Sequence, residues 1–390
     1  MILLKQGMNS NTGGRISIVN FDNSATSFPK PFQVRTAVNQ AFTRYGGNPG
    51  RGGHRLSMIT SEKIFEVREL AAEMFGAKPE NTVFTANCTM SVNMAVKGIM
   101  QNGGHIIISD CEHNAVFRPV YALAKKREVT FSIAHVSDDD EETLENIRRL
   151  IRSDTRCICC MAASNVTGRI LPYKQIGKLC KSYGICFIAD AAQGAGLLDL
   201  TLADGFDFLC MAGHKSLYGP SGTGLLVTSG EYPISTIIEG GTGATSADPE
   251  QTPYLPEKLE SGTVNTMGII GLGEGIRFVL DKGTNHIRKH EESLCQRFER
   301  GIADIKGVKL YSCGNRVPIV SFNIGDYDST TVSLKLSERG FALRGGLHCA
   351  ALAHRSLGTL EQGTVRFSPG AFNDQAQVDK LVRTMKVLYN

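Results

Sequence analysis

The feature that most constrains the fold is an alternation of helix-like and strand-like segments between about residues 60 and 230. Apolar residues spaced three or four apart predict a helix that ends at Gly76, and short apolar runs predict the strands that follow. The expected strands are 82–85, 105–109, 129–134, 156–163, 185–189, 206–212 and 222–228, and the expected helices are 90–100, 115–126, 142–151 and 172–183. This alternation indicates an α/β fold with a mostly parallel, mixed sheet covered by helices on both faces.

The pattern changes character after this region. Residues 239–256 are rich in Gly, Thr, Ser and Pro and show no period, so they are expected to form a long loop. Helices are expected at 269–280 and 287–302, and the rest of the chain alternates more loosely. We therefore predict a large domain over residues 25–270. A smaller α+β domain is predicted to comprise residues 271–390 and the N-terminal residues 1–24.

The composition excludes several classes of protein. Hydrophobic residues make up 42% of the 390 residues and charged residues 21%, which is a globular balance rather than a disordered one. The net charge of +4 is too small to favour a nucleic-acid partner. No apolar run approaches the roughly 18 residues of a membrane helix, and the first residues are too polar for a signal peptide. The expected location is the cytoplasm.

The eleven cysteines predict reduced thiols rather than a disulfide framework, because their number is odd and their spacing shows no pairs. Cys157, Cys159 and Cys160 resemble a metal cluster at first sight. They lie in an apolar strand, however, where Cys157 and Cys159 share one face and Cys160 points to the other. We expect three buried thiols there and no metal site.

Polar residues follow five of the predicted strands, where ligands bind in open α/β sheets. They are Asn87, Cys88 and Thr89; Asp110, Glu112 and His113; Ser164 and Asn165; Asp190 and Gln193; and Gly213, His214 and Lys215. Because the carboxyl ends of parallel strands meet at one edge of the sheet, these residues are expected to converge on one cavity.

Lys215 and Asp190 carry the chemical prediction. A lysine at a strand end in a dry pocket can lose its proton and act as a nucleophile or base. An aspartate facing a pyridinium nitrogen, together with a lysine Schiff base, is the arrangement that pyridoxal phosphate enzymes use. The helix that begins near Asn87 offers a phosphate site at its N-terminus. Taken singly, each feature has a simpler explanation, namely a surface lysine or a helix cap.

The ordered motifs resemble the class V aminotransferase-fold enzymes, and within them the cysteine desulfurases and selenocysteine lyases. The matching segments are Phe21–Thr26, Asn48–Ser57, Glu112–Asn114, Ser164–Gly168, Asp190–Gln193, Gly213–Lys215, Glu260–Thr266, Arg344–Cys349 and Val365–Ser368. The resemblance covers nearly the whole chain. It implies the pyridoxal-phosphate-dependent transferase fold (fold type I) and a pyridoxal 5'-phosphate cofactor.

The resemblance also assigns roles to single residues. Lys215 would hold the cofactor as a Schiff base, Asp190 would pair with its ring nitrogen and Gln193 with its ring oxygen. His113 would stack on the ring, and Cys88, Thr89 and His214 would bind the phosphate. Thr263 would reach the phosphate of the neighbouring subunit of a homodimer. Asn165 and Arg366 would hold the substrate carboxylate, and Arg344 would also bind the substrate. Cys349 would take the sulfur, with Arg344 and His348 near its thiol. The glycines at 345 and 346 suggest a flexible loop around this cysteine.

Three positions depart from the family pattern. Ala212 stands where a phosphate-binding serine is usual, and Gly50 and Leu347 stand where some relatives carry histidines. The predicted reaction is conversion of L-cysteine to L-alanine with a persulfide on Cys349, which a partner protein would collect. The alternatives are selenocysteine lyase activity, another class V reaction such as transamination or C–S lysis, and a non-catalytic scaffold for a sulfur-handling partner.

Overall fold

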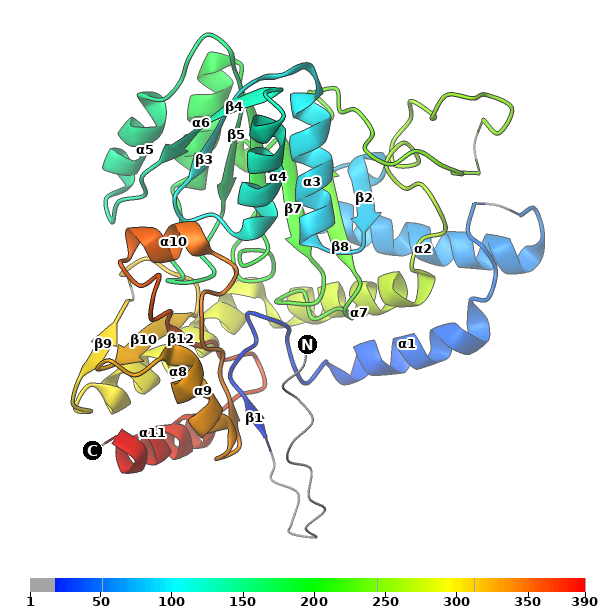
Figure 1. The fold of residues 1–390 in the computed structure, drawn as a ribbon. Coiled ribbons are helices and arrows are strands. Elements are labelled where there is room, and N and C mark those ends of the chain that lie inside the picture. The colour runs from blue at the N-terminus through cyan, green and yellow to red at the C-terminus, as the bar shows by residue number, and fades with distance from the viewer. Residues whose placement is uncertain (1–17, 51, 244, 312, 390) are drawn as a thin grey trace.

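The computed structural model describes residues 18–50, 52–243, 245–311 and 313–389. Its centre is a seven-stranded sheet with helices on both faces (Figure 1). The strand order is β2 (Thr82–Thr85), β8 (Gly224–Thr228), β7 (Phe208–Ala212), β6 (Cys186–Asp190), β5 (Thr155–Met161), β3 (Gly104–Ser109) and β4 (Val129–Ala134). Only β8 runs against its neighbours, so the prediction of a mixed, mostly parallel sheet is confirmed.

The helices of this part are α1 (Phe32–Arg44), α2 (Arg55–Met74), α3 (Cys88–Ile99), α4 (Asn114–Lys125), α5 (Asp140–Arg148), α6 (Tyr173–Tyr183) and α7 (Thr266–Lys282). The predicted helices are all present, with shifted ends. Helix α3 begins two residues earlier than predicted because the Asn87 side chain accepts a hydrogen bond from the Met90 amide at 2.9 Å. This cap fixes the position of the helix N-terminus beside β7.

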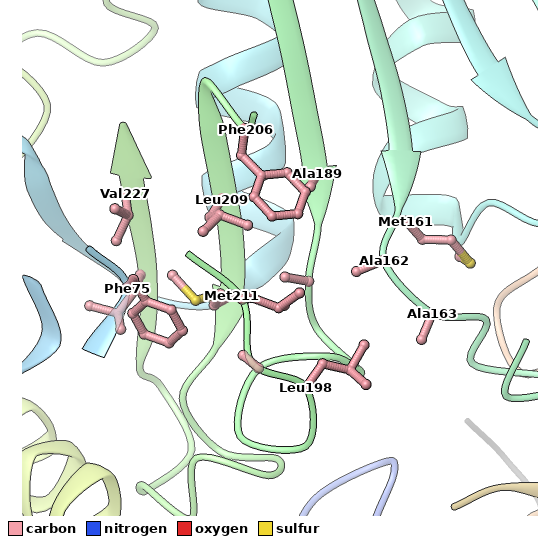
Figure 2. Close-up of a cluster of buried hydrophobic side chains, with 14 of the residues drawn as sticks. Phe75, Met161, Ala162, Ala163, Ala189, Leu198, Phe206, Leu209, Met211 and Val227 are labelled. Carbon is pink, nitrogen blue, oxygen red and sulfur yellow. The ribbon is translucent and has the colours of Figure 1, made fainter. Parts of the chain in front are cut away.

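Apolar side chains fill both faces of the large sheet. On one face, Phe75, Leu209, Met211 and Val227 belong to a single buried cluster (Figure 2). Cys160 packs in this cluster, whereas Cys157 and Cys159 pack in the cluster on the opposite face. The predicted division of the three cysteines between the two faces is confirmed. Burial raises the pKa of each of these thiols, so they remain neutral packing groups.

A smaller sheet lies beyond the carboxyl ends of the parallel strands (Figure 1). It contains β12 (Val365–Phe367), β10 (Val320–Ile324) and β9 (Val308–Leu310), and a separate pair joins β1 (Val19–Asn20) to β11 (Phe341–Ala342). Helices α8 (Thr284–Ile302) and α11 (Gln375–Tyr389) pack against each other beside this sheet, and α9 (Ser329–Ser337) and α10 (Ala351–Ser356) complete it. Of the N-terminal segment 1–24, the described residues Val19 and Asn20 thus pair with the C-terminal part of the chain, and the assignment of the whole segment to the smaller domain stays a prediction.

The domain boundary at residue 270 stays a prediction. Helix α7 runs through this position, and its residues Leu272 and Ile276 pack in the core of the large sheet. Leu294 and Phe298 of α8 instead pack with Phe21 in a third cluster, beside the smaller sheet. The packing favours a division near Gly283, between the two helices.

The predicted loop at 239–256 contains no helix or strand among its described residues, so this expectation is confirmed. In the described part of the chain, no helix combines the length and the apolar character needed to span a membrane.

Candidate active site

A cavity of about 210 Å³ lies at the carboxyl ends of β5, β6 and β7. Ten of the predicted site residues line it, namely Cys88, Thr89, His113, Asn165, Asp190, Gln193, His214, Lys215, Arg344 and Arg366. Cys349 lies at its edge, where its Sγ is 3.4 Å from Nη2 of Arg344. Thr263 lies outside the cavity; it is exposed and accepts a hydrogen bond from Asn48. The sequence therefore predicted a true spatial cluster for every position except Thr263.

Lys215 follows β7 directly and reaches into the cavity. Burial lowers the pKa of its amine, and the nearby Asp190 carboxylate opposes this change. An amine with a lowered pKa is unprotonated for a larger share of the time. Lys215 is therefore suited to attack a carbonyl group and to accept a proton afterwards.

Asp190 ends β6 and has its two oxygens in different surroundings. Oδ1 accepts hydrogen bonds from the Ala192 amide at 2.9 Å and from the Cys88 thiol at 3.3 Å. Oδ2 remains available to a cationic ring nitrogen in the cavity. The Cys88 thiol also lies 3.2 Å from the carbonyl of Cys210, and burial raises its pKa. Its side chain is thus committed to Asp190, which leaves only its backbone N–H for the predicted role at a phosphate.

The N-terminus of α3 supplies the expected anion site. Cys88 and Thr89 are the first two residues of this helix, where backbone N–H groups lack partners within the helix. His214 lines the same cavity, and its buried Nδ1 has no hydrogen-bond partner within the described part of the chain. Burial lowers the pKa of His214 to about 4, so the ring is neutral at pH 7. An unpartnered imidazole nitrogen beside a helix N-terminus fits a phosphate group that accepts hydrogen bonds from both.

His113 caps α4 and enters the cavity from the β3 side. Its Nδ1 accepts a hydrogen bond from the Ala115 amide at 3.0 Å, which leaves Nε2 to carry the ring proton. The pKa of His113 is lowered by burial, and Asp190 opposes this effect. The neighbouring Glu112 is buried and accepts hydrogen bonds from Ser109 and from the Met161 amide. Burial raises the pKa of Glu112 to about 8, so this carboxyl group is mostly neutral at pH 7.

Arg366 lies on β12 and is only 1% exposed. Its Nη1 donates to the carbonyl of Asn165 at 3.0 Å, and its Nη2 pairs with Asp22 at 2.7 Å. Arg366 also lines the cavity, so its guanidinium brings a positive charge to the space that a substrate carboxylate would enter. The amide nitrogen of Asn165 donates to the carbonyl of His348 at 2.8 Å. Asn165 thereby holds the Cys349 loop, and its contact with the substrate stays a prediction.

Asp22 is expected to stabilise the protein through this ion pair. Asp22→Asn would leave the buried guanidinium of Arg366 without a compensating charge, which should cost about 3 kcal/mol of unfolding free energy. Denaturant titration of the two proteins measures this difference. Asp326→Asn, at an exposed position, is the control and should change stability by less than about 0.5 kcal/mol. Equal stability of all three proteins would contradict the role of Asp22.

The Cys349 loop is held at several points. The amide of Asn114 donates to the Cys349 carbonyl at 2.7 Å, and the amide of Gly346 donates to Ser329 at 3.1 Å. A Cβ atom at Gly345 would lie 2.3 Å from the carbonyl oxygen of Ser329, so only glycine fits there. Residues 348 and 349 both have positive φ angles, 49° and 58°, which is costly for side chains other than glycine. Gly345 therefore allows the loop to approach α9 closely.

The two neighbours of the thiol have different roles. Arg344 contacts the Cys349 sulfur and brings a positive charge to it. His348 is buried, and its Nε2 lies 3.0 Å from the carbonyl of Thr364, so Nε2 carries the proton. Burial lowers the pKa of His348 well below its usual range. A neutral ring facing Thr364 brings no charge to the thiol, so of the two neighbours only Arg344 places a charge next to the Cys349 sulfur.

Tyr218, three residues after Lys215, links this segment to α8 and to Ala371. Its hydroxyl lies 3.2 Å from Glu291 of α8 and accepts a hydrogen bond from the Ala371 amide at 2.9 Å. Burial raises the pKa of Glu291 to about 8, far above that of an exposed glutamate.

This shift predicts a pH dependence of stability. The folded protein keeps the Glu291 proton up to about pH 8, whereas the unfolded chain releases it near the ordinary value. The free energy of unfolding should therefore fall as pH rises from about 5 to 8, by about 1 kcal/mol per pH unit from this group. Glu291→Gln should flatten this fall, and the exposed Glu338→Gln should not. Denaturant titrations at several pH values check this prediction. A parallel decline in wild type and Glu291→Gln would contradict it.

Sequence reasoning missed the contribution of the N-terminal segment to the site. Ser24 and Ala25 line the cavity, and the carbonyl of Ser24 accepts a hydrogen bond from Gln193 at 3.0 Å. Asp22 pairs with Arg366, and Ser27 contacts the backbone of Lys215. These residues follow no periodic pattern, and their resemblance to a family motif was the only signal that could have found them.

The residues present fit pyridoxal phosphate. The cavity places an amine with a lowered pKa, the Asp190 carboxylate, an imidazole nitrogen without a hydrogen-bond partner among the described residues, and a helix N-terminus around one space. These groups match the aldehyde, the ring nitrogen and the phosphate of that cofactor. The position of Ala212 beside His214 offers no hydroxyl group, so the helix and His214 would hold the phosphate without a serine.

Comparison with known proteins agrees with this geometry. The family profile described as aminotransferase class-V matches residues 19–381. A probable cysteine desulfurase of Methanothermobacter thermautotrophicus is 30% identical over 374 residues, covering 93% of each chain. One from Pyrococcus abyssi is 30% identical, covering 95% of this chain and 94% of its own. The apo structure of the cysteine desulfurase from Thermococcus onnurineus superposes with a TM-score of 0.89 at 30% identity, covering 95% and 94% of the two chains.

Proposed function

Because this chain belongs to the aminotransferase class-V family, we propose that it is a pyridoxal-phosphate-dependent cysteine desulfurase. It converts L-cysteine to L-alanine and holds the sulfur atom on Cys349 as a persulfide. The observation that carries this proposal is the exposed thiol of Cys349, next to Arg344 at the edge of the cavity that contains Lys215 and Asp190. A reaction confined to the cofactor would need no thiol there.

The residues that line the cavity have separate roles in the proposed reaction. Arg366, whose guanidinium lines the cavity, binds the substrate carboxylate and orients the Cα proton toward Lys215. The cofactor, when bound, withdraws electrons from the substrate carbon. Asp190 keeps the ring nitrogen protonated, the Lys215 amine accepts the Cα proton, and the Nε2–H of His113 is a proton donor at the ring face.

Sulfur transfer then belongs to Cys349. Its thiolate attacks the substrate sulfur, and the Cβ–S bond breaks with its electron pair left on carbon. The carbon takes up a proton and becomes the methyl group of alanine, while the sulfur remains on Cys349 as a persulfide. Alanine and the Cys349 persulfide together contain all the atoms of the cysteine and the thiol that are consumed. Arg344 stabilises the negative charge on sulfur before the attack and on the persulfide afterwards.

One experiment tests this proposal against its alternatives. The protein is incubated with L-cysteine or L-selenocysteine and a reductant, and alanine is measured together with sulfide or selenide. Alanine from cysteine in equal amount to sulfide is expected. Activity on selenocysteine alone would make the protein a selenocysteine lyase, pyruvate with sulfide would indicate C–S lysis, and no turnover with bound cofactor would favour the scaffold.

We also propose that the protein is a homodimer in which Thr263 completes the partner's phosphate site. Four phenylalanines in or next to α1 and α2 are 51–72% exposed, namely Phe28, Phe32, Phe42 and Phe65. A cavity of about 440 Å³ next to Phe65 is lined by Gly262 and Val264, the neighbours of Thr263. A second copy would cover this apolar surface and bring Thr263 toward its site.

Phe32→Glu is expected to weaken this dimer. A charge at the centre of an apolar interface should convert the protein to monomers at micromolar concentration, which sedimentation velocity detects. Cofactor uptake should fall with it, because Thr263 no longer reaches the partner's site. Val387→Glu on α11 is the control, at another exposed apolar residue. A fully active wild-type monomer would contradict the proposal.

The exposed persulfide indicates a protein partner that accepts sulfur, since the Cys349 side chain is open to solvent. All eleven cysteines are free, which favours a reducing compartment, so we propose a cytoplasmic location.

A further inference from the structure

The segment between β1 and α1 contacts the backbone on which the reactive lysine stands. Several donors converge on the carbonyl oxygen of His214. The amide of Ser27 lies at 3.1 Å, the hydroxyl of Thr26 at 3.2 Å and Nζ of Lys30 at 2.8 Å. The hydroxyl of Ser27 reaches the carbonyl of Lys215 at 2.8 Å. The backbone at 214 and 215 is therefore held by residues that precede it by about 190 positions.

The donors and acceptors set the direction of this network. An ammonium group can only donate, so Lys30 Nζ gives one hydrogen to His214 O and another to the Ser27 hydroxyl at 2.7 Å. The Ser27 hydroxyl lies 2.8 Å from Lys215 O and 3.3 Å from His214 O, so its single hydrogen goes to the nearer carbonyl, that of Lys215. Lys30 thus acts on the backbone of Lys215 both directly and through Ser27.

Lys30 makes these contacts at an energetic cost. Burial lowers the pKa of its amine to about 8, so the group is mostly charged at pH 7 but partly desolvated. Within the described ranges of the chain, no carboxylate forms an ion pair with Lys30. Its acceptors are the two groups next to the reactive lysine. A partly buried cation without a counter-charge is a poor choice for stability alone.

We propose that Lys30 is a positioning residue that fixes the backbone of His214 and Lys215, so that the Lys215 amine stands in the cavity opposite Asp190. This inference rests on the proposed function, because it concerns the lysine that would bind the cofactor. It gives the N-terminal segment a specific task in the site rather than a general structural one.

The test compares cofactor-free wild type with Lys30→Met, Lys30→Arg and Lys178→Met. Lys178 is an exposed residue on α6 and serves as the matched control. Pyridoxal phosphate is added, and the adduct trapped on Lys215 by borohydride is measured over time by peptide mass spectrometry. Lys30→Met should react about tenfold more slowly, because a charge-assisted hydrogen bond to His214 is lost. Its bound absorbance should also change with pH around a different midpoint. Lys30→Arg should recover part of the rate, and Lys178→Met should match wild type.

A second measurement needs no cofactor. Acetic anhydride acetylates lysines that reach solvent, so Lys215 released from its buried position should react about threefold faster in Lys30→Met. The opposite changes in the two rates separate loss of positioning from a general loss of reactivity. Acetylation of Lys178 within the same samples and the melting temperature report whether the variant has unfolded.

Ser27→Ala removes the hydroxyl that contacts Lys215 O and accepts from Lys30, but it leaves the direct contact of Lys30 with His214 O. It should therefore shift both rates in the same directions by a smaller factor. Wild-type rates and an unchanged absorbance midpoint in Lys30→Met and Ser27→Ala would overturn the proposal. So would faster acetylation of lysines throughout the chain, Lys178 included, together with a lowered melting temperature, which would make Lys30 merely structural. Failure of the wild type to take up pyridoxal phosphate would instead refute the proposed function, and the acetylation rates would still decide on Lys30.

Discussion

Cys349→Ala should lose desulfurase turnover by about a thousandfold or more while still taking up pyridoxal phosphate. The cavity that holds Lys215, Asp190 and His214 does not include Cys349, so removal of the thiol leaves the cofactor site intact. Sulfur transfer, in contrast, depends on a nucleophile held next to the cavity, and a thiol from solution cannot match that local concentration. Alanine formation from L-cysteine and the bound absorbance measure the two effects separately.

Cys313→Ala is the matched control, because Cys313 is another cysteine that is not fully buried. It should keep wild-type turnover. After a single exposure of wild type to cysteine, mass spectrometry should find the added sulfur on the peptide that contains Cys349. Extra sulfur on another cysteine, or full activity of Cys349→Ala with cysteine, would show that the assignment is wrong. Selenocysteine turnover by Cys349→Ala would show that selenium can leave without the thiol.

Lys215→Ala should lose turnover by about ten-thousandfold, and the purified protein should lack a covalently bound yellow chromophore. The variant removes both the amine that binds the aldehyde and the base that accepts the Cα proton. Burial of this amine is what lowers its pKa, so no surface lysine can replace it. Visible absorbance before and after borohydride treatment, together with alanine formation, measures both losses.

Lys126→Ala, at an exposed position at the end of α4, should absorb and react as the wild type does. Noncovalently held cofactor in Lys215→Ala would survive borohydride but leave on dialysis. A wild type that neither carries nor takes up the cofactor would refute the entire interpretation, whereas normal turnover by Lys215→Ala would refute only the role of this residue.

The sequence was sufficient to predict the central sheet, because its strands are continuous apolar runs separated by helices of regular period. The ends of elements were less accurate where a side chain replaces a backbone hydrogen bond. Strand β7 begins at Phe208 rather than the predicted 206, and the Asp207 carboxylate instead accepts a hydrogen bond from the Phe187 amide at 2.8 Å. Such a bond depends on the fold and leaves no periodic signal.

The site was predictable to the extent that its residues follow strands. Asp190 and Lys215 could be placed from periodicity alone, and the family resemblance added Arg366 and Cys349. The orientation of polar side chains could not be predicted. The thiol of Cys88 turns to Asp190 rather than to a phosphate site, and His348 turns to Thr364 rather than to its neighbour Cys349. These choices depend on burial, which sequence adjacency does not report.

The pairing of Asp22 with Arg366 has a consequence for how the protein is made. The two residues are 344 positions apart, so Asp22 emerges from the ribosome long before Arg366 has been synthesised. The strands of the large sheet can assemble during this interval, but the end of the site that contains Arg366 must wait until β12 has emerged. A chain that terminates early would thus retain Lys215 yet lack Arg366, to which we assign the substrate carboxylate. The proposed reaction therefore becomes possible only when synthesis is complete, because Lys215 and Arg366 are present together only in the full-length molecule.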